Sequence, residues 1–334
     1  MPIELRTITI EPLRNNYDHL EKRFGHKPAS RYQEASYDIQ PVENLHYRPT
    51  WDPDQTLYDP TLSRIRMRDW YDLKDPRQLY YGSYTQARAR QQDTEEANFE
   101  FVESNGLVML MTDALRQQAL DLLVPLRHVA WGADQNNMMV CGYGYGTTFK
   151  QPCVFYALDQ LGIAQYLSRL GLLLGGQDAL VAGKQAWMEA PAWQDMRRYV
   201  EDVMAVRDPV EVFVAQDVVL DGLLYPLVYE RLVDDLLAVQ GGTAVSMLTQ
   251  FMTRWGAETR RWSDSVVKTM AAESAENRAV LEEWITQWGQ RAVAALAPLA
   301  RPVAVDTTDA LMTEQIAAFA GRAAKAGVTI KLEH

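Results

Sequence analysis

The placement of proline divides this chain into two parts that can adopt different structures. More than half of the fifteen prolines lie before residue 77. Proline lacks a backbone N–H and pushes the preceding residue toward extended geometry, so long helices are excluded from this part. The same part is rich in tyrosine and tryptophan, which disordered tails rarely are. We therefore predict an extended arm over residues 1–76 that packs either on its own chain or on another chain.

The second part, residues 77–331, has the periodicity of helices. Apolar residues recur there at three- and four-residue steps, with clear stripes in 255–270 and 280–288. Only the valine-rich segment 210–220 leaves a strand as an alternative. A mostly-α bundle is therefore the predicted architecture. Helix boundaries are predicted at Asn105-Gly106, Gly175-Gly176, Pro191, Asp208-Pro209 and Arg301-Pro302, because glycine ends helices and proline is tolerated only in their first turn.

Composition excludes several classes of protein. A net charge of −11 and a pI near 5.0 argue against nucleic acid as a partner, since phosphate contacts need a basic face. Charged residues interrupt the most apolar stretch, 210–237, so we predict no membrane span. Cys141 and Cys153 cannot form a disulfide scaffold, and a reducing cytoplasmic location is expected. Residues 332–334 resemble the remnant of an expression tag.

The helical part lacks the ligand pattern of a diiron bundle. Such a site takes a glutamate from each of two helices and a Glu-x-x-His pair from each of two others. Between residues 77 and 331 the only histidine is His128, and a proline precedes it by three residues. The pattern Glu43-x-x-His46 falls in the proline-rich arm, where no helix is expected. We therefore predict no catalytic residue, no metal ligand and no cofactor in this chain.

The remaining motifs favour structural roles. The glycines of segment 142–146 lack the G-x-G-x-x-G spacing of a dinucleotide site, so we expect a kinked or tightly packed section of helix. The carboxylate pairs 95–96, 234–235 and 282–283 are expected on solvated helix faces, because adjacent helical residues do not face one another. Tryptophan is frequent, and a core role is favoured over an interface for Trp187, Trp193, Trp255, Trp262 and Trp284.

Three segments resemble the β subunits of bacterial multicomponent monooxygenases. Asp75-Pro-Arg-Gln-Leu-Tyr-Tyr-Gly-Ser-Tyr84, preceded by Asp69-Trp-Tyr71, resembles their D-P-x-Q-L-x-Y-x-x-Y element. Segments 260–268 and 277–288 resemble their R-W-x-x-x-x-V-K and N-x-x-V-[IL]-x-x-W-I-x-x-W elements. The arm segments 24–33 and 36–39 look most like the phenol hydroxylase branch. The resemblance covers nearly the whole chain.

This resemblance implies a ferritin-like helical bundle that lacks the metal ligands. In the family, an (αβγ)₂ hydroxylase carries a diiron site in its α subunit, and β is a paralogue of α without iron. Segment 159–163 of this chain stands where an α-type chain would read D-E-x-x-H. In that register Gln160 replaces the glutamate and Ile163 the histidine, and neither an amide nor an alkyl group can hold iron.

The function implied is that of a non-catalytic β subunit of phenol hydroxylase. The complex would convert phenols to catechols with electrons from NADH, delivered by a reductase that holds FAD and an iron–sulfur cluster, together with a regulatory protein. A toluene or other aromatic monooxygenase subunit, a small diiron oxidase and a free-standing helical scaffold remain as alternatives. The aromatic residues predicted to contact other subunits are Tyr32, Tyr37, Tyr47, Trp51, Tyr58, Trp70, Tyr81 and Tyr84.

Overall fold

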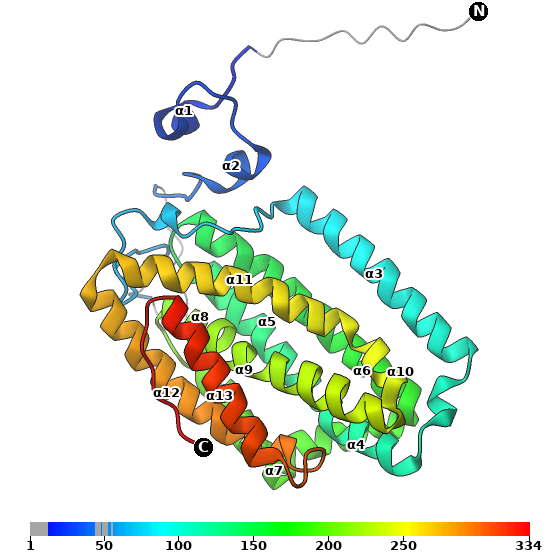
Figure 1. The fold of residues 1–334 in the computed structure, drawn as a ribbon. Coiled ribbons are helices and arrows are strands. Elements are labelled where there is room, and N and C mark those ends of the chain that lie inside the picture. Colours follow the sequence, from blue (N-terminus) through cyan, green and yellow to red (C-terminus); the bar gives the residue numbers. More distant parts are fainter. Residues whose placement is uncertain (1–12, 44–47, 49–52, 55) are drawn as a thin grey trace, which may run out of the picture.

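The computed structural model describes residues 13–43, 48, 53–54 and 56–334, which fold mainly into a bundle of helices (Figure 1). No strand occurs in these ranges. Four elements are not α-helical: η1 and η2 are 3₁₀ turns, and η3 and η4 are π-helical. In chain order the elements are α1 (Asp18–Phe24), α2 (Arg31–Ser36), η1 (Trp70–Asp72), α3 (Tyr81–Ser104), η2 (Leu107–Leu110), α4 (Asp113–Leu123), α5 (Leu126–Tyr143), α6 (Thr147–Glu189), α7 (Pro191–Met204), α8 (Pro209–Phe213), η3 (Val214–Leu220), α9 (Asp221–Tyr225), η4 (Pro226–Gly242), α10 (Thr243–Leu248), α11 (Gln250–Glu273), α12 (Ala275–Ala300) and α13 (Thr308–Lys325).

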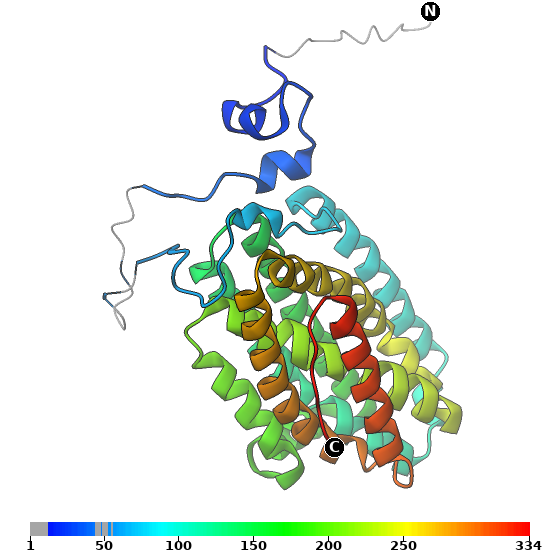
Figure 2. The same cartoon turned by 60° about the vertical axis from the view of Figure 1, so that its left-hand side comes forward.

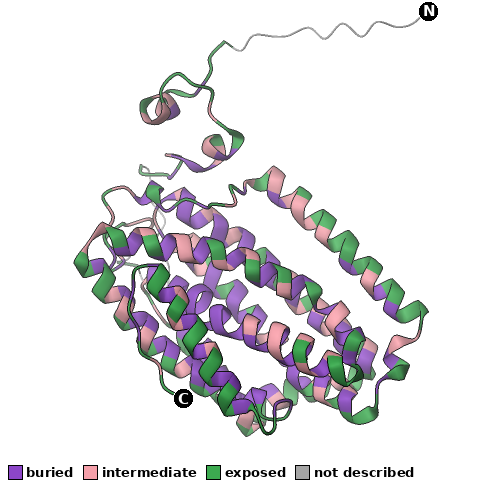
Figure 3. Cartoon of the chain, in the orientation of Figure 1, coloured by how far each residue is buried: buried purple, intermediate pink, exposed green. Residues whose placement is uncertain are grey.

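The core lies where α5, α6, the helix from α8 to η4, α11 and α12 meet. Helices α5 and α6 form an antiparallel hairpin, and the buried positions of all these helices face one another (Figure 3). The predicted tryptophan core is confirmed. The exposed fraction is at most 7% for Trp187, Trp193, Trp255, Trp262 and Trp284.

Most of the predicted helix boundaries are confirmed, and each has a local cause. Gly106 follows α3 with a φ of +60°, a conformation that glycine adopts without strain. Pro191 occupies the first turn of α7. The Asp208 carboxylate caps α8 by accepting hydrogen bonds from the N–H groups of the next helical turn. Gly176 breaks the helical geometry inside α6 with a φ of +67°.

The stretch 107–140 divides into η2, α4 and α5, and Pro125 lies between the last two. One expectation about helices was wrong. Gly144 and Gly146 do not kink a helix but form the turn between α5 and α6, while Gly142 lies in the last turn of α5. Gly146 has a φ of +82°, and a Cβ there would lie 3.0 Å from the Cβ of Trp70. The turn therefore uses glycine for backbone freedom and for close packing.

The valine-rich segment 210–220 is helical, and it opens one long apolar helix that runs from Pro209 to Leu248. The most apolar window of this helix could cross a membrane by its composition, but 94% of that window is buried inside the bundle, as expected of a core helix. Two of its sections are π-helical, a rare geometry in which backbone hydrogen bonds span five residues.

Arg322 of α13 stabilises the end of the first π-helical section. Its guanidinium donates hydrogen bonds to the carbonyl oxygens of Val218 (2.9 Å) and Gly222 (3.4 Å), and it pairs with Asp264 of α11 at 2.9 Å. A Cβ at Gly222 would lie 2.5 Å from the guanidinium. Glycine at this position therefore leaves room for the arginine.

The arm is less extended than predicted, because it contains α1 and α2. Both lie at one end of the bundle, near the start of α3 (Figures 1 and 2). A capping box between Ser30 and Gln33 begins α2. The later part of the arm joins the main core through Ile65, Trp70 and Leu73, which are at most 6% exposed.

At the other end of the chain, Leu332 packs on Gly289, and Glu333 exchanges hydrogen bonds with Gln290.

Replacing Arg322 with methionine should lower the free energy of unfolding by about 2–4 kcal/mol, because two carbonyl groups and the Asp264 carboxylate lose a charged donor. Urea denaturation would measure the change. Arg301→Met is the matched control, since Arg301 is exposed, and it should change the stability by less than about 0.5 kcal/mol. Equal stabilities of the two variants would contradict this role for Arg322.

Candidate subunit interface and the degenerate metal-ligand positions

The two positions predicted to have lost metal ligands lie inside the bundle. Gln160 and Ile163 of α6 are 1% and 0% exposed. The amide of Gln160 donates a hydrogen bond to Asp221 and accepts one from the hydroxyl of Tyr225, both at 3.3 Å. Ile163 belongs to the hydrophobic core. The predicted register therefore places both side chains toward the centre of the bundle, facing α9.

Asp221 is the polar centre of this region. Its carboxylate accepts hydrogen bonds from Tyr156 at 2.6 Å and from Gln216 at 3.1 Å, in addition to the bond from Gln160. Burial raises the pKa of Asp221 to about 7, while the hydrogen bonds from Tyr156 and Gln216 act in the opposite direction. The donors come from α6 and η3, so this carboxyl group joins two helices.

These residues do not fit an iron site. Both ends of the Gln160 amide are engaged within the protein, and Ile163 offers no donor atom. The void that Gln160, Ile163, Asp221 and Tyr225 help to line has a volume of about 10 Å³, roughly that of a single water molecule. Across the described ranges, no three residues of the types His, Cys, Asp and Glu come together as a metal would require.

Two further buried hydrogen bonds lie near Asp221, and the motifs of the sequence did not predict them. Asn137 of α5 donates a hydrogen bond to Asp217 at 2.8 Å, and Asn136 donates one to Gln216 at the same distance. Burial raises the pKa of Asp217 well above its ordinary value, with repulsion from Asp221 adding to it. The sequence signal for this buried cluster was the presence of two carboxylates, Asp217 and Asp221, four residues apart in an apolar stretch.

Asp159 precedes Gln160 in the chain but points to the other side of α6. It is 5% exposed and accepts hydrogen bonds from the Tyr84 hydroxyl (2.9 Å), both arms of the Arg88 guanidinium (2.8 and 2.7 Å) and the Trp255 indole (2.9 Å). Burial alone would lower the pKa of Arg88, but Asp159 and Glu258 outweigh it and raise that pKa. This carboxylate therefore fastens α3 and α11 to α6.

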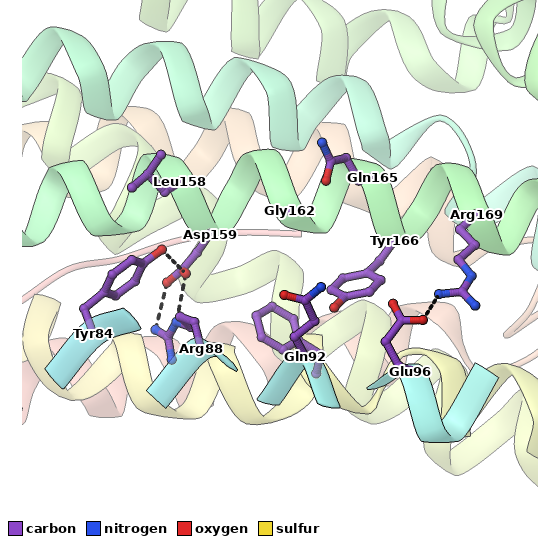
Figure 4. A pocket seen from close by; sticks show the side chains of 11 residues that line it. Tyr84, Arg88, Gln92, Glu96, Leu158, Asp159, Gly162, Gln165, Tyr166 and Arg169 are labelled. Atoms are coloured by element: carbon purple, nitrogen blue, oxygen red, sulfur yellow. Dashed lines mark hydrogen bonds and ion pairs between the residues drawn. The ribbon is translucent and has the colours of Figure 1, made fainter. Parts of the chain in front are cut away.

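A groove runs between α3 and α6 beside this cluster (Figure 4). Its volume is about 460 Å³. Tyr84 and Arg88 meet Asp159 at one end, and an ion pair of 2.7 Å between Glu96 and Arg169 stands at the other. Gly162, Gln165 and Tyr166 line the groove between them.

Large apolar side chains are exposed on both helices of the α5–α6 hairpin. The exposed positions along α5 are Trp131, Gln135 and Met138, and along α6 they include Leu158 and Leu161. Trp131 is 52% exposed, and the two leucines are 42% and 41% exposed. Exposed helix positions of soluble proteins are normally polar or charged, so exposed apolar side chains on two adjacent helices are typical of an interaction surface. We call these five residues the hairpin face.

Most of the aromatic residues predicted to contact other subunits are used inside the chain. Tyr32 and Tyr37 are buried together with Leu20 and Tyr71. Trp70 lies in the main core, and Tyr84 stacks on Phe155. Tyr58 is half-buried under the ammonium group of Lys150, whereas Tyr81 is 72% exposed. Tyr47 and Trp51 lie outside the described residues. Contact of any of them with another subunit stays a prediction, and Tyr81 is the most accessible.

A family model described as methane/phenol/alkene hydroxylase matches residues 51–274, well over half of the chain. The chain belongs to this family. Within it, the chain is 47% identical, over the full length of both proteins, to the phenol 2-monooxygenase oxygenase component DmpL of Pseudomonas sp. (strain CF600). It is 45% identical to the corresponding component MhpL of Acinetobacter pittii (strain PHEA-2), over 92% of this chain and 94% of the relative.

The fold agrees with this assignment. The structure matches a chain of phenol hydroxylase from Pseudomonas sp. OX1 with a TM-score of 0.90 and 43% identity, over 98% of this chain and 99% of that one. A chain of toluene 4-monooxygenase matches with a TM-score of 0.76 at 18% identity, over 89% of this chain and 99% of that one, which shows the shared fold alone. The predicted helical fold and the phenol hydroxylase branch are both confirmed.

Restoring the missing ligand types should destabilise the protein. Gln160→Glu combined with Ile163→His places a carboxylate and an imidazole in the core without partners, and the free energy of unfolding should fall by about 3–5 kcal/mol. Urea denaturation would measure this change. Val181→His on the exposed side of α6 serves as the control and should have little effect. A double variant as stable as the wild type would mean that these positions do not lie in a packed core.

Proposed function

We propose that this chain is the non-catalytic β subunit of the oxygenase component of a phenol hydroxylase. The complex would hydroxylate phenols to catechols with electrons from NADH. In this proposal an α subunit holds the diiron site, a γ subunit completes an (αβγ)₂ assembly, and a reductase with FAD and an iron–sulfur cluster supplies electrons together with a regulatory protein. The protein would work in the cytoplasm, without a membrane or nucleic acid.

The observation that carries the proposal is the chemistry at positions 160 and 163. A diiron bundle needs a glutamate and a histidine three residues apart on a helix like α6. Here Gln160 uses its amide within a hydrogen-bond network, and Ile163 fills the core. Full-length similarity to oxygenase components, combined with a centre that cannot hold iron, supports a subunit whose role is structural.

The hairpin face is the proposed contact with the α subunit. Trp131 and Leu158 lie at similar distances along α5 and α6 from the turn at Gly144–Gly146 and both are exposed, and we infer that they form one apolar surface. Large aromatic side chains in the centre of such a surface contribute much of the energy of binding. A rigid β subunit bound there would hold the iron-bearing helices of α in position, which metal sites require. The accessible Tyr81 at the start of α3 would add a second contact.

Co-expression with the α and γ subunits tests this proposal. A variant with Trp131→Glu and Leu158→Glu should lose at least about tenfold in affinity for α, because association would bury two unpaired charges. Pull-down of α by tagged β measures assembly, and catechol formation by the reconstituted system should fall in parallel. Val239→Glu is the matched control, because Val239 is 82% exposed and lies outside the hairpin face.

Three results would contradict different parts of the proposal. Undiminished assembly of the double variant would show that α binds another surface, while leaving the subunit role intact. Purification of the wild-type chain without any partner subunit would instead favour a free-standing scaffold. Phenol oxidation by the isolated chain would contradict its non-catalytic role.

A further inference from the structure

Helix α3 turns one stripe of side chains toward the rest of the protein, and a carboxylic acid stands in the middle of it. The stripe consists of Tyr84, Arg88, Glu95, Phe99 and Val102. Glu95 is 2% exposed, so the expectation that the pair 95–96 is solvated is wrong for its first member. A helix packed only for stability would carry an apolar residue at this position.

The two ends of α3 are held firmly. Near its start, Arg88 reaches Asp159 of α6 and Glu258 of α11, at 2.7 and 3.1 Å. Near its end, Phe99 and Val102 are 0% exposed and belong to the core or pack against it. The middle of the helix depends on Glu95, whose Oε2 atom is buried and has no hydrogen-bond partner.

Grooves lie on both sides of α3. The groove between α3 and α6 has a volume of about 460 Å³ and is lined on α3 by residues as far as Glu96. The groove between α3 and α11 has a volume of about 760 Å³ and is lined on α3 by Ala87 and Gln91, one turn before Glu95. The ribbon of α3 runs along the outside of the bundle in both views (Figures 1 and 2). Because a groove lies on either side of α3, the turns around Glu95 can move without breaking a dense core.

The environment of Glu95 favours its neutral form. Burial raises its pKa to about 7, and Glu96 on the same helix adds to this effect. Three features oppose it: hydrogen bonds from the Asn98 side chain and the Phe251 backbone N–H, and the charge of Arg254 on α11. On α6, burial and the charge of Glu95 raise the pKa of the Tyr166 hydroxyl. Arg169 of the same helix pairs with Glu96 rather than with Glu95.

We propose that α3 is a strap that closes over the two grooves when Glu95 is protonated and loosens at its centre when Glu95 ionises. The ends of the helix stay anchored by the Arg88 ion pairs and by Phe99, so the movement is confined to the turns around Glu95. An opened strap would join the two grooves and expose their floor, including Tyr166 and Phe251.

The direction of the pH effect follows from the two states of the strap. The pKa of Glu95 is about 7 in the closed strap and near its ordinary 4.5 in the open one. Between these values the open strap has released a proton that the closed strap retains. The equilibrium constant for opening of the strap should therefore increase by on the order of tenfold per pH unit from about pH 4.5 to pH 7, and it should level off above pH 7.

Hydrogen exchange of the full-length chain, alone or in the complex with which it copurifies, tests the strap. After correction for intrinsic exchange rates, opening of the amides around Glu95 should rise on the order of thirtyfold between pH 5 and pH 7. Amides of α12 should show no such change. In Glu95→Gln and Glu95→Leu the rise should be absent, because neither side chain ionises.

Glu100→Gln is the control variant, because Glu100 lies on the same helix and is exposed, and it should keep the wild-type pH dependence. The strap would be disproved if exchange around Glu95 in the wild type is flat across this pH range. It would also be disproved if Glu95→Gln retains the wild-type rise. Neither result depends on whether the chain binds an α subunit.

Discussion

A single buried carboxylate, that of Asp159, joins three helices of this protein. It receives four hydrogen bonds, from Tyr84 and Arg88 on α3 and from Trp255 on α11, while its own backbone belongs to α6. Arg88 extends the connection to Glu258, and it places a positive charge directly beside the buried Asp159 carboxylate. A buried charge without such partners would cost several kcal/mol. The position of α3, and with it both flanking grooves, depends on this cluster.

Asp159 and Gln160 are adjacent in the chain but serve different parts of the bundle. Neighbouring residues on a helix point about 100° apart, so Asp159 faces α3 and α11 while Gln160 faces the centre of the bundle. The outward carboxylate maintains the scaffold. The inward amide joins Asp221 and Tyr225 in a closed network of side-chain hydrogen bonds. The fold can therefore persist without metal, because protein groups satisfy the polar atoms of Gln160 and Asp221.

Sequence patterns could predict the helices and the core, but not the tertiary roles of single polar residues. The stripe at Trp255 and Trp262 and the caps at Asp208 and Gly106 are local signals, and the structure confirms them. The burial of Glu95 could not be predicted, because it depends on which distant helices cover each face, whereas that of Asp217 was signalled only by its place in an apolar stretch. The aromatic content of the arm correctly indicated a packed segment. Whether Tyr32 and Tyr37 contact their own chain or another was not readable from composition, and the structure shows them packed together.

The central claim is that the space beside Gln160 is closed by protein groups and does not take up iron. Anomalous diffraction at the iron edge, from crystals of the complex of this chain with its partner subunits, tests it most directly. We predict iron peaks in the α subunit and none between α6 and α9 of this chain. An iron peak beside Gln160 and Asp221 would contradict the account.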